Sequence, residues 1–261
     1  PATLRRQRQM CIRDRPYNAG IAAANAIEAC GLARRGFTSA VDGLGGPQGF
    51  VPAHHPQHDS SEAILPDGSE TSFMFADVRH KLHACCHGAH AMIEGLRNLV
   101  AAHDITAQNL AALSIRVNPR WLKVCDIKAP RTGLEVKFSY VFLAAMVLHH
   151  IDTAAYQSYD DSICGDAGLI ATASKITVIG DEAISDGAVN VSADTQTGVR
   201  HTTDFDLMDP IDLSVLGPRL VAKASVLIGP ARAEKIWESM DDLDSMPAAQ
   251  MARCLQPLQN A

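Results

Sequence analysis

Residues 79–96, RHKLHACCHGAHAMIEGL, change from a run of titratable side chains into an apolar helix pattern. Four of the chain's 11 histidines, two adjacent cysteines and a lysine fall within residues 80–90. A helix is expected over residues 86–102, in which the apolar residues Ala89, Ile93 and Leu96 follow the spacing of one face. His87, His90 and Glu94 would share a face of this helix. Because the N-terminus of a helix favours negative charge, this stretch predicts an anion site, with a metal site or a polar loop as alternatives.

The composition is that of a globular chain, 261 residues long, with 47% hydrophobic and 20% charged residues. A net charge of −6 without a clustered basic face argues against nucleic acid as a partner. No apolar run approaches the roughly 18 residues that a membrane span requires. The seven cysteines are odd in number, scattered and without a CxxC pair, which indicates a reducing compartment. We therefore expect a cytoplasmic protein that binds neither nucleic acid nor membrane.

Helix and strand patterns alternate on both sides of the opening stretch. A helix of small residues is expected over 22–33, ending at Gly36, and a strongly apolar helix over 138–148. Strand-like alternation occurs four times, in residues 113–117, 175–179, 189–192 and 199–204. From Asp212 onwards the pattern is helical again. This order predicts an α+β module inserted between helical parts.

Two segments fit no packed element. Residues 1–15 contain five arginines without apolar periodicity, and we interpret them as a segment foreign to the fold. Residues 51–72 are polar and rich in proline and histidine, which is typical of a boundary loop.

Short motifs follow one another from about Pro16 onwards. They are NAGIAA at 18–23, GFT at 36–38, GPQGF at 46–50, KLHACC at 81–86 with His90, KFS at 137–139 and DP at 209–210. In this order and spacing they resemble the MmgE/PrpD family, which includes 2-methylcitrate dehydratase, cis-aconitate decarboxylase and iminodisuccinate epimerase.

The resemblance implies a mostly helical α+β fold with two domains. Residues 16–72 and 211–261 would be parts of a discontinuous all-α domain, and residues 73–210 a smaller α+β lid domain. It further implies a homodimer whose active site lies between the domains and uses no metal or other cofactor. The family's helical domain begins before the equivalent of Pro16, so the resemblance also predicts an N-terminally truncated chain.

Lys81 and His90 are the predicted catalytic residues. Lys81 matches a substrate-site lysine of the family, whose substrates carry two or three carboxylates. A lysine at the mouth of a helix can neutralise one carboxylate and the negative charge that develops as a C–H or C–C bond breaks. His90 can exchange a proton, because the pKa of histidine lies near working pH.

Five further residues are predicted to contact the substrate: His83, Cys86, His87, Ser139 and Tyr140. Ser139 also fits an N-cap of the helix over 138–148, and Cys86 fits a buried packing thiol. The histidines and Cys86 are competent zinc ligands too, but the sequence contains no distant second ligand pair, so no metal site is predicted.

The expected function is that of an MmgE/PrpD-type lyase, a dehydratase or decarboxylase acting without metal on a small di- or tricarboxylate such as 2-methylcitrate or cis-aconitate. One alternative is an epimerase or isomerase of the same family. The alternative from another class is a truncated, non-catalytic paralogue or an incomplete fragment.

Overall fold

A computed structural model describes residues 15–54 and 78–256, and the chain divides into two compact units, Pro1–Val78 and Arg79–Ala261. The first unit contains the helices α2 (Arg15–Arg34) and α3 (Phe50–His54). The predicted small-residue helix is confirmed as part of α2, and the chain leaves it at Gly36 with a positive φ of 83°.

Two predictions for the first unit need comment. The boundary loop expected over 51–72 is wrong at its start, because residues 51–54 belong to α3. The rest of that loop lies outside the described residues. So does the predicted foreign segment, apart from Arg15, which begins α2.

The second unit is built on a four-stranded mixed sheet in the order β2-β1-β3-β4. The strands are β1 (Leu110–Val117), β2 (Ile176–Gly180), β3 (Ala188–Thr195) and β4 (Arg200–Asp206). β1 runs parallel to β2 and antiparallel to β3, and β3 and β4 form an antiparallel hairpin. All four predicted strands are confirmed. In β1 and β3 the alternating apolar residues face one buried side.

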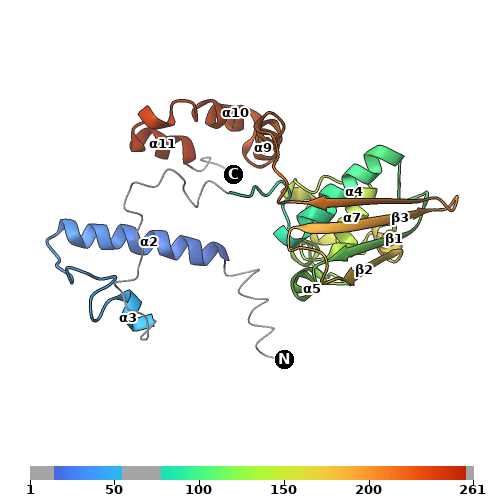
Figure 1. Ribbon diagram of the computed structural model, residues 1–261. Helices are drawn as coiled ribbons and strands as arrows, with labels where there is room; N and C mark the ends of the chain where they lie inside the picture. Colours follow the sequence, from blue (N-terminus) through green and yellow to red (C-terminus); the bar gives the residue numbers. More distant parts are fainter. Residues whose placement is uncertain (1–14, 55–77, 257–261) are drawn as a thin grey trace. The chain divides into compact units, whose positions relative to one another are not determined.

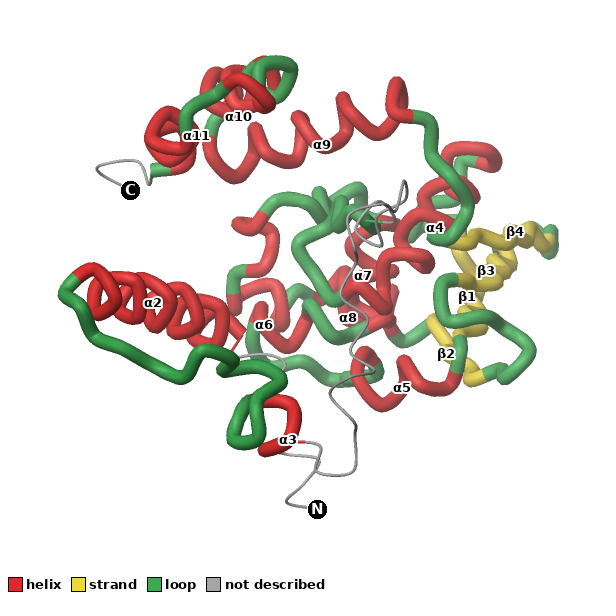
Figure 2. The backbone as a smooth tube through the Cα atoms, turned by 60° about the vertical axis from the view of Figure 1, so that its left-hand side comes forward, coloured by secondary structure: helices red, strands yellow, loops and turns green. Residues whose placement is uncertain are grey.

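Helices α4 (His90–His103) and α7 (Tyr140–Leu148) lie on the same side of the sheet (Figures 1 and 2). Gly95 lets α4 come close, since a Cβ there would lie 3.2 Å from Cβ of Phe205 and 3.3 Å from Cγ1 of Val189. Every residue of α7 is buried, as its continuous apolar sequence requires. The core therefore fills the space between this face of the sheet and the two helices.

The opposite face of the sheet carries polar cross-strand pairs. Asn190 donates to Asp204 over 2.8 Å, and the hydroxyls of Ser192 and Thr202 are 3.1 Å apart. Such pairs stabilise a sheet face that is open to water.

Further helices connect and follow the strands of the second unit. They are η3 (His87–Ala89), α5 (Pro119–Cys125), α6 (Gly133–Val136), η4 (Tyr156–Tyr159), η5 (Asp161–Gly165), α8 (Ala167–Ala173), α9 (Leu213–Ile228), α10 (Pro230–Glu238), η6 (Leu243–Ser245) and α11 (Ala248–Leu255). The helical C-terminal pattern is thus confirmed. Its breaks occur at Gly229, with a φ of 87°, and at Pro247.

The described residues form a mixture of helix and sheet, as expected for an α+β protein. The pairing of residues 16–72 with 211–261 in one helical domain, and the identity of 73–210 as a lid, stay predictions. None of the described helices combines the length and the apolar character needed to cross a membrane.

Candidate functional site

The histidine-rich stretch approaches the core as an extended segment held at two points. The amide of Ala84 donates to the carbonyl of Thr153 over 2.9 Å, and the amide of Cys86 donates to that of Lys137 over 3.0 Å. The turn η3 follows, and α4 begins at His90, four residues after the start predicted from the sequence. The difference arises because Cys86 keeps an extended backbone, with a ψ of 138°.

Four side chains form what we call the paired network: His83, Glu94, Thr153 and Arg219. Nε2 of His83 lies 2.8 Å from Oε1 of Glu94, and Nδ1 lies 2.7 Å from the hydroxyl of Thr153. Arg219 of α9 donates to the same oxygen of Glu94 over 2.7 Å. His83, Thr153 and Glu94 are buried, so each of these bonds lies largely away from water.

The paired network keeps Glu94 ionised. Burial alone would raise its pKa, but the hydrogen bonds from His83 and Arg219 and the charge of Arg219 outweigh burial and lower the pKa to about 2. Both nitrogens of His83 are occupied by these partners. Its predicted contact with substrate stays a prediction, because in this arrangement it has no nitrogen to offer.

His90 differs from its neighbour His83 in having a nitrogen without a partner. The side chain is 1% exposed, and no group in residues 15–54 or 78–256 forms a hydrogen bond with Nε2. Its ring centroid lies 5.0 Å from that of His83 and 5.4 Å from that of His87. Burial, followed by the charges of the surrounding histidines and lysines, lowers the pKa of His90 to about 2.

Three lysines form what we call the lysine cluster: Lys81, Lys137 and Lys223. Lys81 is exposed, and its charge acts on both other lysines and on His87 and His90. Within the described residues no carboxylate lies close enough to pair with any of the three. Among the described residues the cluster is therefore a concentration of positive charge without a carboxylate counter-charge.

Burial and the charge of Lys81 weaken the protonation of Lys137 and Lys223. Burial, and then the charge of Lys81, lowers the pKa of Lys223. Burial also lowers the pKa of Lys137, where the nearby thiol of Cys85 opposes the shift and Lys81 adds to it. The ammonium of Lys137 lies 4.5 Å from the ring centroid of Tyr156 and 4.9 Å from that of Tyr159, which attracts the cation to this position.

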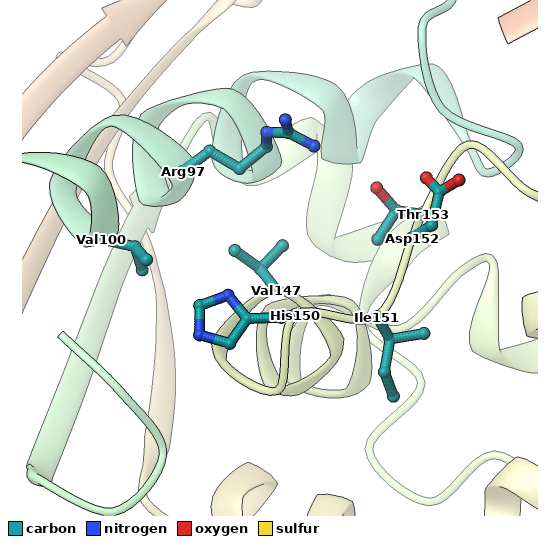
Figure 3. A pocket seen from close by; sticks show the side chains of 7 residues that line it. All are labelled: Arg97, Val100, Val147, His150, Ile151, Asp152 and Thr153. Atoms are coloured by element: carbon teal, nitrogen blue, oxygen red, sulfur yellow. The ribbon is translucent and has the colours of Figure 1, made fainter. Parts of the chain in front are cut away.

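Two cavities adjoin the paired network and share Arg97 and Asp152 as lining residues. The larger measures about 420 Å³, and Figure 3 shows Arg97 of α4 across it from His150, with Asp152 and Thr153 at its far end. The smaller, about 210 Å³, is also lined by His83, Arg219 and Lys223. It therefore connects the paired network to the lysine cluster.

The other predicted site residues have structural partners. Ser139 is buried and caps α7 by accepting from the amide of Phe142 over 3.3 Å, as expected for an N-cap. Tyr140 is fully buried, and its hydroxyl donates to the carbonyl of Gly88 over 2.7 Å. Cys86 lies beside the buried thiol of Cys125. Their substrate contacts stay predictions.

Sequence reasoning missed Arg219 and Lys223. Lys223 donates to the carbonyl of Lys81, one helical turn after the contact of Arg219 with Glu94. The spacing of four residues places both on one face of α9, and that spacing was the only signal in the sequence. Nothing in it connects α9 with residues 81–94.

No group of three histidine, cysteine or acidic side chains is arranged to hold a metal ion in the part of the chain that the structure describes. The zinc alternative therefore gains no support there. Of the four ligands that it requires, His83 already uses both ring nitrogens within the paired network.

The comparisons with known proteins agree with the motifs in the sequence. No curated protein matches the chain. The model of the MmgE/PrpD C-terminal domain matches residues 83–207, which include the histidine-rich stretch from His83, helices α4 and α7 and the whole sheet. This match supports membership of the MmgE/PrpD family.

Proposed function

We propose that this chain is a lyase of the MmgE/PrpD type that acts on a small di- or tricarboxylate. Members of the family are generally lyases or related enzymes. The observation that carries the proposal is the lysine cluster, whose three lysines have no carboxylate partner among the described residues. The charges of Lys81 and Lys223 act on His90, and the charge of Lys81 acts on His87. A ligand with two or three carboxylates supplies the missing counter-charge.

The proposed reaction begins with removal of a proton from a carbon next to a carboxylate. Lys81 and Lys223 neutralise the substrate carboxylates and the negative charge that spreads onto them as the C–H bond breaks. His90 accepts the proton on Nε2. In a dehydratase the hydroxyl group then leaves with the electrons of the C–O bond and takes up a proton to become water. A decarboxylase omits the C–H step: its C–C bond breaks first, carbon dioxide leaves and the carbanion takes up a proton.

His90 needs a change in its surroundings before it can act as a base, because burial is the largest cause of its low pKa. The charges of Lys81 and Lys223 contribute to the low pKa of His90. A bound polycarboxylate neutralises these charges and raises the pKa of His90 towards the range useful for proton transfer. Because Nε2 is buried, the proposal requires the side chains around it to shift when substrate binds.

The proposal includes the finer expectations of the sequence: no metal takes part, Lys81 and His90 are catalytic, and the chain forms a homodimer. Sedimentation velocity measures the last of these. An epimerase would use the same proton abstraction and return the proton to the other face of the carbon.

The test combines binding and turnover in the full 261-residue chain. Turnover of 2-methylcitrate, citrate and cis-aconitate is followed by the ultraviolet absorbance of the conjugated carboxylate, and binding of the unreactive propane-1,2,3-tricarboxylate by calorimetry. We expect Lys81→Ala to lower kcat/KM by about 100-fold, the scale of losing one group that stabilises an anionic transition state. Lys123→Ala, an exposed lysine of α5, is the matched control and should stay within about twofold.

The outcomes separate the alternatives. If Lys81→Ala keeps kcat/KM within about twofold of wild type, the anion-holding role is wrong. Tight binding of the tricarboxylate without turnover of any substrate favours the non-catalytic alternative. Exchange of a substrate proton with deuterium oxide, with no loss of water or carbon dioxide, favours the epimerase.

A further inference from the structure

We propose that Arg219 of α9 is a positioning residue for the candidate site. Its bond to Glu94 fixes the tautomer of His83, and this in turn fixes the orientation of the ring against which His90 packs. The kinetic consequence of this inference rests on the proposed function, but its structural consequence does not. Three steps carry it.

The first step concerns the single oxygen that His83 and Arg219 share. Oε1 of Glu94 lies 2.8 Å from Nε2 of His83 and 2.7 Å from Nη2 of Arg219. An ionised carboxylate can only accept hydrogen bonds, so Nε2 of His83 must carry a hydrogen. In the neutral form of the ring Nδ1 is then an acceptor, to which the hydroxyl of Thr153 at 2.7 Å can donate.

The second step concerns why Arg219 is needed. Glu94 is 8% exposed, and burial favours its protonated form. A protonated Glu94 would carry an O–H group, which can donate to Nε2 of His83 and reverse the tautomer. The guanidinium of Arg219 supplies a charged hydrogen bond that keeps the carboxylate ionised and pointing at His83.

The third step connects the tautomer with His90. The rings of His83 and His90 meet edge to face, with centroids 5.0 Å apart and an angle of 67° between their planes. Because both nitrogens of His83 are hydrogen-bonded to other groups, its ring cannot rotate freely, and His90 packs against a ring of fixed orientation. Nε2 of His90 is a buried imidazole nitrogen without a hydrogen-bond partner in the described part of the chain.

Helix α9 reaches both ends of the stretch. Arg219 contacts Glu94 across 125 residues of sequence, and Lys223 donates to the carbonyl of Lys81 across 142. The two contacts come from one face of α9. The arrangement of the histidines thus depends on a helix that lies outside the matched residues 83–207.

Nitrogen-15 NMR of the histidine rings in the full chain tests the inference without any substrate. In the wild type we expect the His83 ring to show a protonated Nε2 and an unprotonated, hydrogen-bonded Nδ1. Arg219→Met removes the charged donor and should shift or mix these signals, whereas Arg219→Lys should restore most of the wild-type pattern. Arg200→Met, which breaks an exposed ion pair with Asp194, is the matched control and should leave the ring unchanged.

A second variant guards against loss of folding. Arg219→Gln keeps a hydrogen-bond donor without the charge, and its fold is checked by circular dichroism. If the His83 signals of the folded Gln and Met variants equal those of the wild type, the inference is wrong.

In the kinetic assay Arg219→Met should lower kcat by about tenfold with KM within about twofold, the scale of losing a group that orients a site residue. A wild-type chain without turnover counts against the proposed function alone, and the NMR outcome still decides the positioning.

Discussion

The paired network and the lysine cluster meet at the same stretch of chain, yet their charges are balanced in opposite ways. Glu94 in the network has two hydrogen-bond donors, and these lower its pKa to about 2. In the lysine cluster burial and repulsion lower the pKa of Lys137 and Lys223 instead. The network therefore stabilises the folded state, whereas the cluster costs stability that a bound anion would return.

The largest effect is expected from breaking the paired network. Glu94→Ala leaves the buried His83 and the half-buried Arg219 without their shared acceptor, and we expect it to lower the free energy of unfolding by about 3 kcal/mol. Urea denaturation followed by circular dichroism measures the change. Asp194→Ala, which breaks the exposed pair with Arg200, is the control and should cost much less. Equal losses in the two variants would mean that the network is no more than a surface ion pair.

A somewhat smaller effect is expected from acid, and it depends on His90. Burial, aided by nearby positive charges, lowers its pKa from 6.5 to about 2, so the unfolded chain takes up a proton below about pH 6.5 while the folded chain does not. The stability from this neutral histidine is complete above that pH and is lost as the pH falls. Glu94 adds a similar loss only below its ordinary pKa of 4.5.

His90→Gln should therefore flatten the pH dependence of stability. Linkage predicts a loss of about 2 kcal/mol between about pH 7 and pH 5 in the wild type that the variant lacks. Urea unfolding at both pH values, with His103→Gln as the exposed control on the same helix, measures it. An unchanged pH dependence in His90→Gln would show that another group titrates.

The sequence predicted best where local pattern and burial agree. The apolar run over 138–148 became α7, with Ser139 as its N-cap, and the alternating runs became the sheet. The prediction failed at residues 86–89, where the amide of Cys86 bonds to the carbonyl of Lys137 and delays the helix. The spacing of apolar residues along a segment cannot reveal a contact with a residue so far along the chain.

The candidate site was predicted in part for the same reason. Lys81, His87 and His90 stood out because they lie within one short motif. Glu94 was expected on a helix face with His87 and His90, but it bonds to His83 of the extended segment. Arg219 and Lys223 come from a helix more than a hundred residues away, and only the folded chain brings them to the stretch.

The smallest effect on stability, and the one with the opposite sign, is expected from the lysine cluster. Lys81→Gln removes an exposed charge that repels Lys137 and Lys223, so the free energy of unfolding should change by less than about 0.5 kcal/mol or rise. Since both neighbours have a lowered pKa, the unfolded wild type binds more protons and its stability should increase towards pH 10.5, the ordinary value. The variant should gain less, which urea unfolding at neutral and alkaline pH measures against Lys123→Gln. If Lys81→Gln lowered the free energy of unfolding by more than about 1 kcal/mol at neutral pH, Lys81 would be a structural residue. The lysine cluster would then stabilise the folded state as the paired network does, which contradicts the anion-binding role of Lys81.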